Sequence, residues 1–356
     1  MWQSEHQTAA THPQLGNIAA VESSVSTLPG IREKVAFLSK PEAYGLGSRR
    51  IDVRETHMSW VFMTETHAWK LKKPVRYEYL DFSTPEARRK DCEEEVTLNR
   101  RLAPDVYFGV VPLTVDSDGH FCLGGPGQPI DWLVRMRRLP SERMLDQAIA
   151  NRTWTEDDIR KVALRLAHFY RKQARPVAMA GAEDRAQLSG DLLAARIELS
   201  HSEYELPSDL IQSAFSRELI RLGQDADLFD ARARSGKVVD GHGDLRPEHI
   251  CLGQEPVIID CLEFNDALRR LDPASELSFL ALECERLGAP RVGALVLETY
   301  CDVTGDRPPL RLVQFYKGYH ACIRAKIAIG HLRDTGFGNA AKWRDRAVEY
   351  LRYAVM

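Results

Sequence analysis

One segment constrains the fold of this chain more than any other: Gly241-His242-Gly243-Asp244-Leu245-Arg246-Pro247-Glu248-His249-Ile250, followed by Val257-Ile258-Ile259-Asp260. Two short apolar runs, 250–252 and 257–259, flank Gly253-Gln254-Glu255-Pro256, which is typical of a four-residue turn between antiparallel strands. Symmetric pairing would set residue 252 opposite 257 and residue 250 opposite 259. Because cross-strand partners share a face of the sheet, His249 and Asp260 are predicted to meet at the open end of this hairpin, with Asp244 on the loop beside them.

Two carboxylates placed in this way suit phosphoryl transfer, in which one acid accepts a hydroxyl proton and a second group holds a metal ion on the nucleotide phosphates. An imidazole ligates a metal ion only while it is neutral, and it suits Zn²⁺ or Mn²⁺ better than Mg²⁺, which prefers oxygen. The residues therefore predict a proton acceptor at Asp244 and a metal site on Asp260, with His249 as a second ligand.

The motif His-Gly-Asp-x-x-Pro at 242–247, with Ile-Asp at 259–260, resembles the catalytic core of the aminoglycoside phosphotransferase and choline kinase-like family. The resemblance implies an α+β, two-lobed protein-kinase-like fold, with a small antiparallel-sheet N-lobe and a larger, mainly helical C-lobe. It also implies ATP-dependent phosphorylation of a small-molecule hydroxyl, with Mg²⁺ or Mn²⁺ as cofactor. Asp244 matches the catalytic aspartate, and His249 stands where the family has a metal-binding asparagine.

A kinase also needs a cation on the small lobe to hold the nucleotide phosphates, and in the family this is a lysine in an Ala-x-Lys context. Ala68-Trp69-Lys70 matches that context, and Lys72 is the alternative because it shares the strand face by period two. The resemblance selects Glu95 of Glu93-Glu94-Glu95 as the partner of the lysine, and Glu94 stays open as an alternative. The stretches 56–62, 69–75, 99–104 and 262–266 further resemble an uncharacterised bacterial branch of the family.

The resemblance places the adenine base at the connection 134–140, with Met136 and Arg138 as candidate cofactor-binding residues. The glycine-rich phosphate loop of the family is not visible, because no glycine lies between residues 50 and 70. Donors of Thr56 and Ser59 are candidates to replace it. This absence, together with His249, favours a second interpretation, a kinase-like binding or scaffold protein with little or no catalysis. The joint presence of Asp244, Asp260 and Lys70 favours the enzyme.

The predicted organisation is a disordered tail over 1–30, an N-lobe over 31–136, and a helical C-lobe over 137–356 with the catalytic loop at 241–263. Strands are expected at 60–64, 67–71, 107–115 and 131–136, and a helix from Thr84-Pro85-Glu86, a typical capped start, to about residue 102. The stretch 176–190 is predicted to be a loop. A long helix is expected near the end of the chain. On it, Arg324 with Lys317 or His320 could bind an anionic substrate. The alternative is that these are surface residues, whose aliphatic parts cover apolar area while their charged groups stay in water.

Composition sets the limits on partners and compartment. The chain has 356 residues and a formal net charge of −3, which gives no reason to expect nucleic acid or an anionic membrane as a partner. No apolar run approaches the ~18 residues that a membrane helix needs, and residues 1–30 lack the basic start and apolar core of a secretory signal. Seven scattered cysteines without a C-x-x-C pair predict free thiols in the cytoplasm. The expected partner is a small-molecule substrate with a hydroxyl group.

Overall fold

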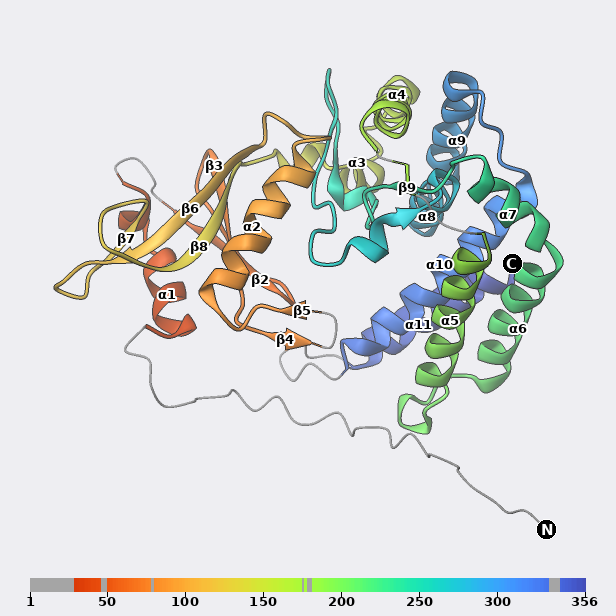
Figure 1. Cartoon of the computed structure of the whole chain (residues 1–356), viewed down its shortest axis with the longest axis horizontal. Coiled ribbons are helices and arrows are strands. Elements are labelled where there is room, and N and C mark those ends of the chain that lie inside the picture. The colour runs from red at the N-terminus through yellow and green to blue at the C-terminus, as the bar shows by residue number, and fades with distance from the viewer. Residues whose placement is uncertain (1–28, 46–49, 78–79, 175, 178–180, 333–339) are drawn as a thin grey trace, which may run out of the picture.

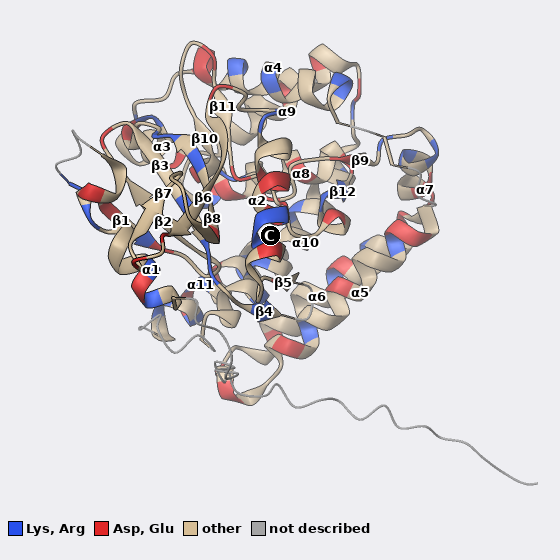
Figure 2. Cartoon of the chain, turned by 60° about the vertical axis from the view of Figure 1, so that its left-hand side comes forward, with Lys and Arg blue, Asp and Glu red and all other residues tan. Residues whose placement is uncertain are grey.

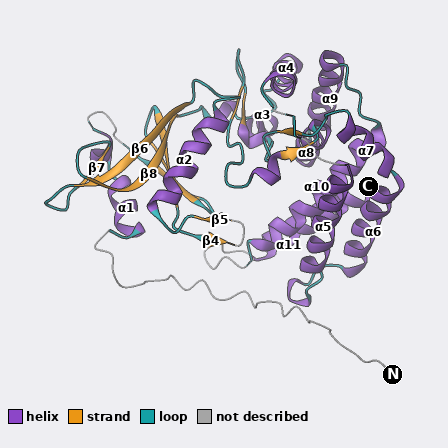
Figure 3. Ribbon diagram, in the orientation of Figure 1, coloured by secondary structure: helices purple, strands orange, loops and turns teal. Residues whose placement is uncertain are grey.

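The computed structural model describes residues 29–45, 50–77, 80–174, 176–177, 181–332 and 340–356. Within these ranges the larger sheet lies at one end of the molecule and most helices lie at the other (Figure 1, Figure 3). The predicted tail over 1–30 falls almost entirely outside the described residues, which begin at residue 29.

A six-stranded antiparallel sheet forms the smaller part, in the order β1-β2-β3-β8-β6-β7. Its strands are β1 (Asp52–Glu55), β2 (Ser59–Met63), β3 (His67–Lys72), β6 (Tyr107–Val115), β7 (Phe121–Leu123) and β8 (Gln128–Arg137). Three two-stranded pairs complete the strands: β4 (Arg76–Tyr77) with β5 (Leu80–Asp81), β9 (Val239–Asp240) with β12 (Arg270–Leu271), and β10 (Ile250–Cys251) with β11 (Val257–Ile258).

The two faces of the large sheet are covered by different elements, because side chains alternate along each strand. On one face, Trp69 and Leu71 of β3 join a buried cluster that includes Leu38 of α1 (Ile31–Leu38). The other face is covered by α2 (Pro85–Asn99), which packs against β8 and β6. Lys70 and Lys72 point to this second face, so β3 carries both lysines toward α2.

Helix α2 begins where the sequence predicts. The Thr84 hydroxyl accepts a hydrogen bond of 3.1 Å from the Ala87 backbone N–H, Pro85 occupies the first turn, and Glu86 places a negative charge at the positive end of the helix. The helix ends at Asn99, three residues before the predicted end. Its buried side includes Cys92, Glu95, Val96 and Asn99, so a carboxylate and an amide lie on the side that faces the protein interior.

Helices make up most of the larger part. They are α3 (Leu145–Asn151), α4 (Glu156–Lys172), α5 (Gly181–Leu199), α6 (Ser208–Gln224), α7 (Ala226–Arg234), α8 (Pro273–Arg286), α9 (Pro290–Thr304), α10 (Leu310–Gly330) and α11 (Ala340–Val355). Short 3-10 turns are η1 (Pro41–Tyr44), η2 (Ser141–Arg143), η3 (Ser202–Tyr204), η4 (Pro247–His249) and η5 (Asp266–Arg269). The loop predicted over 176–190 is wrong from residue 181 onward, because α5 begins at Gly181 and buries Leu188 and Leu192 against neighbouring helices.

Three apolar clusters among the described residues hold the helical part together. One joins α3, α4, α8 and α9 to the segment 241–263 through Leu245, Ile250 and Ile258. A second joins α5, α6, α10 and α11, and a third joins α5, α6, α7, α8 and α10. In the view of Figure 2, basic and acidic residues are interspersed along α5, α6 and α7. No helix among the described residues is long and apolar enough to span a membrane, and all seven cysteines are free thiols.

Candidate active site

Two lysines and one glutamate form the centre of the site. Lys70 and Lys72 lie two residues apart on β3, and Glu95 of α2 lies between them and is fully buried. One Glu95 oxygen lies 2.9 Å from Lys70 Nζ, and the other lies 2.7 Å from Lys72 Nζ. Glu94, the alternative partner from the sequence, is exposed. Both candidate lysines therefore bind the same carboxylate.

Lys70 connects the sheet to the catalytic segment. Its Nζ also lies 2.9 Å from Asp260 Oδ1. Burial lowers the pKa of Lys70, but the charges of Asp260 and Glu95 outweigh it and raise that pKa well above its usual value. Burial likewise raises the pKa of the Asp260 carboxyl, but the charge of Lys70 holds it well below its usual range. The pair is therefore ionised at neutral pH.

Lys72 forms a second, more deeply buried set of ion pairs. Its Nζ lies 2.5 Å from Asp91 Oδ2 and forms a short contact with Glu263, three residues after Asp260. Lys72 is 1% exposed. Two lysines thus share four carboxylates, those of Asp91, Glu95, Asp260 and Glu263. Burial raises the pKa of Glu263 to about 7, and the negative charge of Glu95 adds to this rise. The positive charge of Lys72 opposes it but does not outweigh burial.

The raised pKa of Glu263 predicts a pH dependence of stability. A carboxyl whose folded-state pKa lies above its unfolded value stabilises the fold fully below the unfolded pKa, and this contribution is lost as the pH rises through the folded pKa. The free energy of unfolding should therefore fall between about pH 4.5 and pH 8, by roughly 1–3 kcal/mol from this group. Glu263→Gln should reduce the fall measured by urea unfolding at pH 5 and pH 8 by this amount, while Glu218, whose pKa burial raises to about 7, continues to contribute. An unchanged fall in the variant would contradict this origin.

The catalytic turn is held by a buried glutamate of α8. Glu276 accepts hydrogen bonds from the backbone N–H groups of His242, at 2.9 Å, and Gly243, at 2.6 Å, and from the Tyr170 hydroxyl at 2.5 Å. Gly243 has a φ of +87°, and a Cβ there would lie 3.0 Å from Leu262 Cβ, so glycine suits this position. The turn that presents Asp244 is therefore fixed from behind by Glu276.

Asp244 is ionised and partly open to solvent. Its Oδ2 accepts a hydrogen bond of 3.0 Å from Arg246 Nε, and its side chain is 28% exposed. Burial raises the pKa of Asp244, but nearby positive charge, above all that of the Arg246 guanidinium, outweighs burial and lowers it. The carboxylate can therefore accept a proton from a group that approaches its open side. Arg246 was not singled out from the sequence.

Hydrogen bonds fix the orientation of two histidines beside Asp244. His242 Nε2 lies 2.9 Å from the Ile259 carbonyl and must donate, whereas its Nδ1 accepts from the Asp244 N–H at 3.3 Å. Burial lowers the pKa of His242 to about 3. His249 Nδ1 donates to the Asp244 carbonyl at 2.8 Å, and its Nε2 accepts from Arg246 at 3.1 Å. His242 therefore orients the loop, as its place in the turn suggests.

Asp260 is positioned by contacts from the small lobe. Its backbone has a φ of +62°, a left-handed conformation that aspartate and asparagine adopt more readily than most residues. Its N–H donates to the Tyr107 hydroxyl at 3.2 Å, and the N–H of Cys261 donates to Asn99 Oδ1 at 2.9 Å. Asn99 also donates to the Glu95 carbonyl at 2.9 Å. One helix, α2, thus places Glu95 and fixes the backbone that follows Asp260.

Asp260 offers a suitable ligand for a hard cation. Its side chain is 44% exposed, and its Oδ2 lies 3.4 Å from His249 Nε2. Mg²⁺ is commonly bound through one or two carboxylates, with phosphates and waters as the remaining ligands. His249 Nε2 already accepts a hydrogen bond from Arg246, so a metal ion on this nitrogen would have to replace that bond. The residues therefore fit a cation at Asp260 better than one at His249.

The predicted register of the catalytic hairpin is wrong by one residue. Ile250 pairs with Ile258, and Cys251 pairs with Val257, instead of 250 with 259 and 252 with 257. The cause is a contact outside the hairpin, since the N–H of Leu252 donates to the Arg143 carbonyl at 2.8 Å and leaves the strand. His249 and Asp260 still lie side by side.

The turn between β1 and β2 occupies the position at which the resemblance predicts a glycine-rich phosphate-binding loop. The Thr56 N–H and hydroxyl both donate to the Ser59 carbonyl, at 2.8 and 3.0 Å, and the Ser59 N–H donates to the Thr56 hydroxyl at 3.0 Å. These donors are used within the turn itself. The two donors of Thr56 and the N–H of Ser59 are therefore not free to bind a phosphate in this arrangement, which leaves the Ser59 hydroxyl as the remaining candidate.

The connection between the lobes holds the two remaining candidates. Met136 lies in β8 between Ala68 of β3 and Tyr107 of β6, and it packs in the cluster that includes Val257 and Ile259. The Arg138 guanidinium donates to the Thr64 carbonyl at 2.7 Å and to Asp52 at 2.9 Å. Arg138 thus ties the connection to the sheet, and base binding by these two residues stays a prediction.

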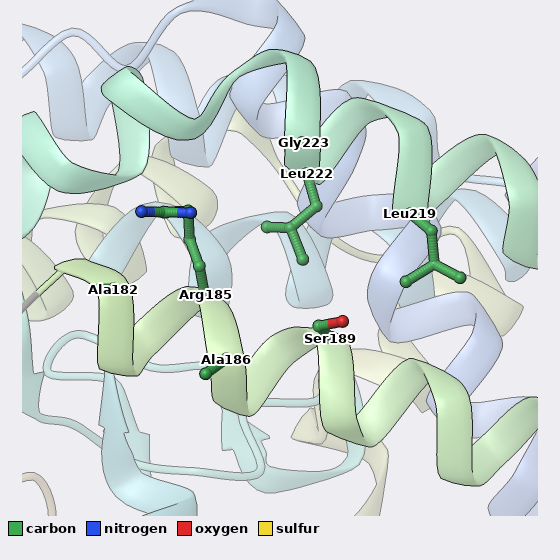
Figure 4. A pocket seen from close by; sticks show the side chains of 7 residues that line it. All are labelled: Ala182, Arg185, Ala186, Ser189, Leu219, Leu222 and Gly223. Atoms are coloured by element: carbon green, nitrogen blue, oxygen red, sulfur yellow. The ribbon is translucent and has the colours of Figure 1, made fainter.

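Two other features lie apart from these residues. A shallow hollow of about 310 Å³ between α5 and α6 is lined by small residues, two leucines and Arg185 (Figure 4). Arg185 is bound to Asp230, at 2.9 and 3.1 Å.

Asp116, Asp118 and His120 lie close together after β6, but the Asp116 carboxylate accepts hydrogen bonds from the backbone N–H groups of the other two. These two hydrogen bonds explain why Asp116, Asp118 and His120 lie close together without a metal ion.

A solved structure decides the fold. The GDP complex of wild-type aminoglycoside 2'-phosphotransferase-IIIa matches 91% of this chain and 98% of its own length, with a TM-score of 0.55 at 13% identity. The chain has the fold of an aminoglycoside phosphotransferase. The predicted α+β, two-lobed, kinase-like fold is thus confirmed. A choline kinase from Cryptosporidium parvum Iowa II covers 91% of this chain and 94% of its own, at 11% identity and a TM-score of 0.48.

Curated relatives are less informative about activity. An uncharacterized protein of Mycobacterium tuberculosis (strain ATCC 25618 / H37Rv) is 34% identical over 297 residues, which cover 78% of this chain and 54% of the relative. An uncharacterized protein of Mycobacterium bovis matches to the same extent. The chain spans about half the length of these relatives. No protein-family model matches the sequence.

Proposed function

We propose that the protein is an ATP-dependent phosphotransferase that phosphorylates a hydroxyl group of a small molecule. The observation that carries this proposal is Lys70, which binds Glu95 and Asp260 at 2.9 Å each. His249 lies between the two catalytic carboxylates, with Nδ1 3.7 Å from Asp244 Oδ2 and Nε2 3.4 Å from Asp260 Oδ2. A phosphate-binding cation, a metal ligand and a proton acceptor are therefore grouped at one place.

In the proposed reaction, the acceptor hydroxyl oxygen bonds to the γ-phosphorus of ATP while the bond from that phosphorus to the bridging oxygen breaks, and ADP leaves. Asp244 takes the hydroxyl proton, which its lowered pKa allows because the carboxylate is ionised at neutral pH. Lys70 holds the phosphates, in place of its bond to Asp260, while Glu95 keeps the lysine in position. Asp260 would hold Mg²⁺ or Mn²⁺, which would neutralise part of the negative charge of the phosphates. Positioning and charge account for most of the acceleration.

A catalytically weak or inactive kinase-like binding protein is the second candidate. It is favoured by the β1–β2 turn, which contains no glycine and in which the two donors of Thr56 and the N–H of Ser59 are used within the turn. A scaffold has no need for an ionised Asp244, Asp260 and Lys70 in one cluster, so the enzyme is the better-supported function. The two candidates differ in their response to nucleotide and metal.

The test is thermal denaturation with ATP or GTP, each with Mg²⁺ or Mn²⁺. A ligand that binds only the folded state at 100 times its Kd stabilises it by about 2.7 kcal/mol, which raises Tm. We expect a metal-dependent rise in the wild type that is lost in Asp260→Asn, since asparagine tolerates the left-handed backbone but removes the charge.

Asp266→Asn is the matched control, because Asp266 is an exposed carboxylate six residues further along that pairs with Arg270. This variant should keep the full rise in Tm. No rise with any nucleotide and metal in the wild type would support the scaffold function instead. A rise that persists in Asp260→Asn would remove the metal role of Asp260.

A further inference from the structure

The acceptor side of Asp244 is shaped by helix α8. Its first turn holds the catalytic turn through Glu276. Ser275, Phe279 and Glu283 follow one another at intervals of four residues, so they share one face of α8. This face extends from the catalytic turn over about 6–12 Å, at 1.5 Å per residue.

Helix α10 places Arg324 and His320 against that face. The His320 ring stacks on Phe279 with centroids 4.7 Å apart, and His320 Nε2 lies 2.9 Å from the Ser275 hydroxyl. The Arg324 guanidinium lies 6.0 Å from the Phe279 ring and 5.8 Å from the Tyr350 ring. Its side chain is only 20% exposed, so Arg324 is not a surface cation with its head in bulk water.

Arg324 is held through one nitrogen and leaves the other two for a ligand. Its Nε lies 3.5 Å from the Tyr350 hydroxyl and 3.8 Å from Glu283 Oε1. Within the described ranges, no hydrogen bond or ion pair is found for its two terminal nitrogens. Glu283 is itself bound more closely by Arg286, at 3.1 Å, and by the Tyr350 hydroxyl, at 2.7 Å. The positive charge of Arg324 is therefore only partly neutralised.

Among the described residues, three carboxylates on α8 and on the turn before β10 are already paired. Glu248 lies 2.6 Å from Arg246, Glu283 binds Arg286, and Glu285 lies 2.6 Å from Lys317. A polycationic acceptor needs unpaired carboxylates, whereas a planar guanidinium with two free nitrogens suits a carboxylate or phosphate oxygen pair. Helix α10 also reaches the turn before Asp244, because His320 contacts Ser275, and the adjacent Glu276 binds the N–H of Gly243. The charge of Arg324 contributes in addition to the lowered pKa of Asp244.

We infer that the acceptor is an anionic hydroxy compound, a hydroxy acid or a sugar phosphate, whose negative group binds the terminal nitrogens of Arg324 while its hydroxyl faces Asp244. This inference rests on the proposed phosphotransferase function and specifies its substrate class. The charge of Arg324 would repel an aminoglycoside or another polycation at this position.

The experiment compares three probes that share one carbon skeleton: glucose 6-phosphate, glucose and glucosamine, which are anionic, neutral and cationic. Glycerate and glycerol form a second anionic and neutral pair. Affinity is measured by calorimetry at constant ionic strength with Mg²⁺ and a non-hydrolysable ATP analogue, and turnover is measured by ADP release with ATP. We expect at least one anionic probe to bind more tightly than its neutral counterpart by about 10- to 100-fold, as for hydrogen bonds to charged groups.

Arg324→Gln should abolish this preference, and Arg324→Lys, which keeps the charge but loses the paired nitrogens, should retain part of it. Lys326→Gln is the matched control, since it removes a positive charge two residues along α10, about 200° around the helix. It should keep the full preference. The Mg²⁺–ATP shift in Tm shows that each variant is folded.

The two levels of the proposal fail separately. Without a Mg²⁺–ATP shift in the wild type, the phosphotransferase function fails. With that shift present, preference for glucosamine, equal binding of all probes, or an anion preference that survives Arg324→Gln would overturn the assignment of Arg324 and the anionic acceptor.

Discussion

Asp244→Asn is expected to lower the rate of phosphoryl transfer by about 10²- to 10⁴-fold, the range typical for loss of a general base. An amide oxygen can still accept the hydrogen bond from Arg246, now 3.0 Å long, but it cannot take the hydroxyl proton. The turn should stay intact because Glu276 holds it through backbone groups. The rate is measured as ADP release with saturating Mg²⁺–ATP and the best acceptor probe.

Nucleotide binding provides the internal check on this variant. The Mg²⁺–ATP shift in Tm should remain close to the wild-type value, since Lys70 and Asp260 are unchanged. Glu248→Gln is the matched control, because Glu248 lies on the same loop, is 40% exposed, and contacts Arg246 rather than the open side of Asp244. It should keep most of the activity. A wild-type rate in Asp244→Asn would show that another group takes the proton.

Lys72→Met is expected to destabilise the protein by about 3–5 kcal/mol, the range for removal of one partner of a buried ion pair. The reason is the arrangement of charges around it. Lys72 Nζ contacts Asp91, Glu95 and Glu263, and its side chain is 1% exposed. Without it, these carboxylates would share only Lys70, which contacts Glu95. The measurement is the free energy of unfolding in urea at pH 7.

Lys73→Met is the matched control, because Lys73 is the next residue and pairs with Glu55, which is 47% exposed. An exposed ion pair contributes about 0–1 kcal/mol, so this variant should be close to the wild type. Combining Lys72→Met with Glu263→Gln should recover part of the loss, since one unpaired carboxylate is removed. Equal stability of Lys72→Met and Lys73→Met would contradict the buried cluster.

Much of the site follows from short-range patterns. The glycine and aspartate motif at 241–244, with Asp260 nearby in sequence, predicts the catalytic segment, and period two predicts that Lys70 and Lys72 share a face. The choice between these lysines was left open from sequence, and the reason is visible: both bind Glu95. The start of α2 follows from Thr84 and Pro85 alone.

The parts that were missed depend on contacts between distant residues. Tyr107 binds a backbone group 153 residues away, and Glu276 binds Gly243 across 33 residues, with no local signal in either case. The hairpin register is set by Arg143, which lies outside the hairpin. The start of α5 at Gly181 is likewise missed, because its helix is stabilised by apolar packing that small and charged residues do not reveal.

The left-handed backbone of Asp260 limits which residues the position can hold. A side chain with a Cβ pays of order 1 kcal/mol for this conformation, and only glycine avoids it, with asparagine and aspartate next. Mutational drift without selection for the carboxylate would therefore move this codon toward glycine, which relieves the backbone and abolishes the ligand. Among homologues, an aspartate kept at the position of Asp260 would therefore indicate selection for the carboxylate, as the proposed metal role requires.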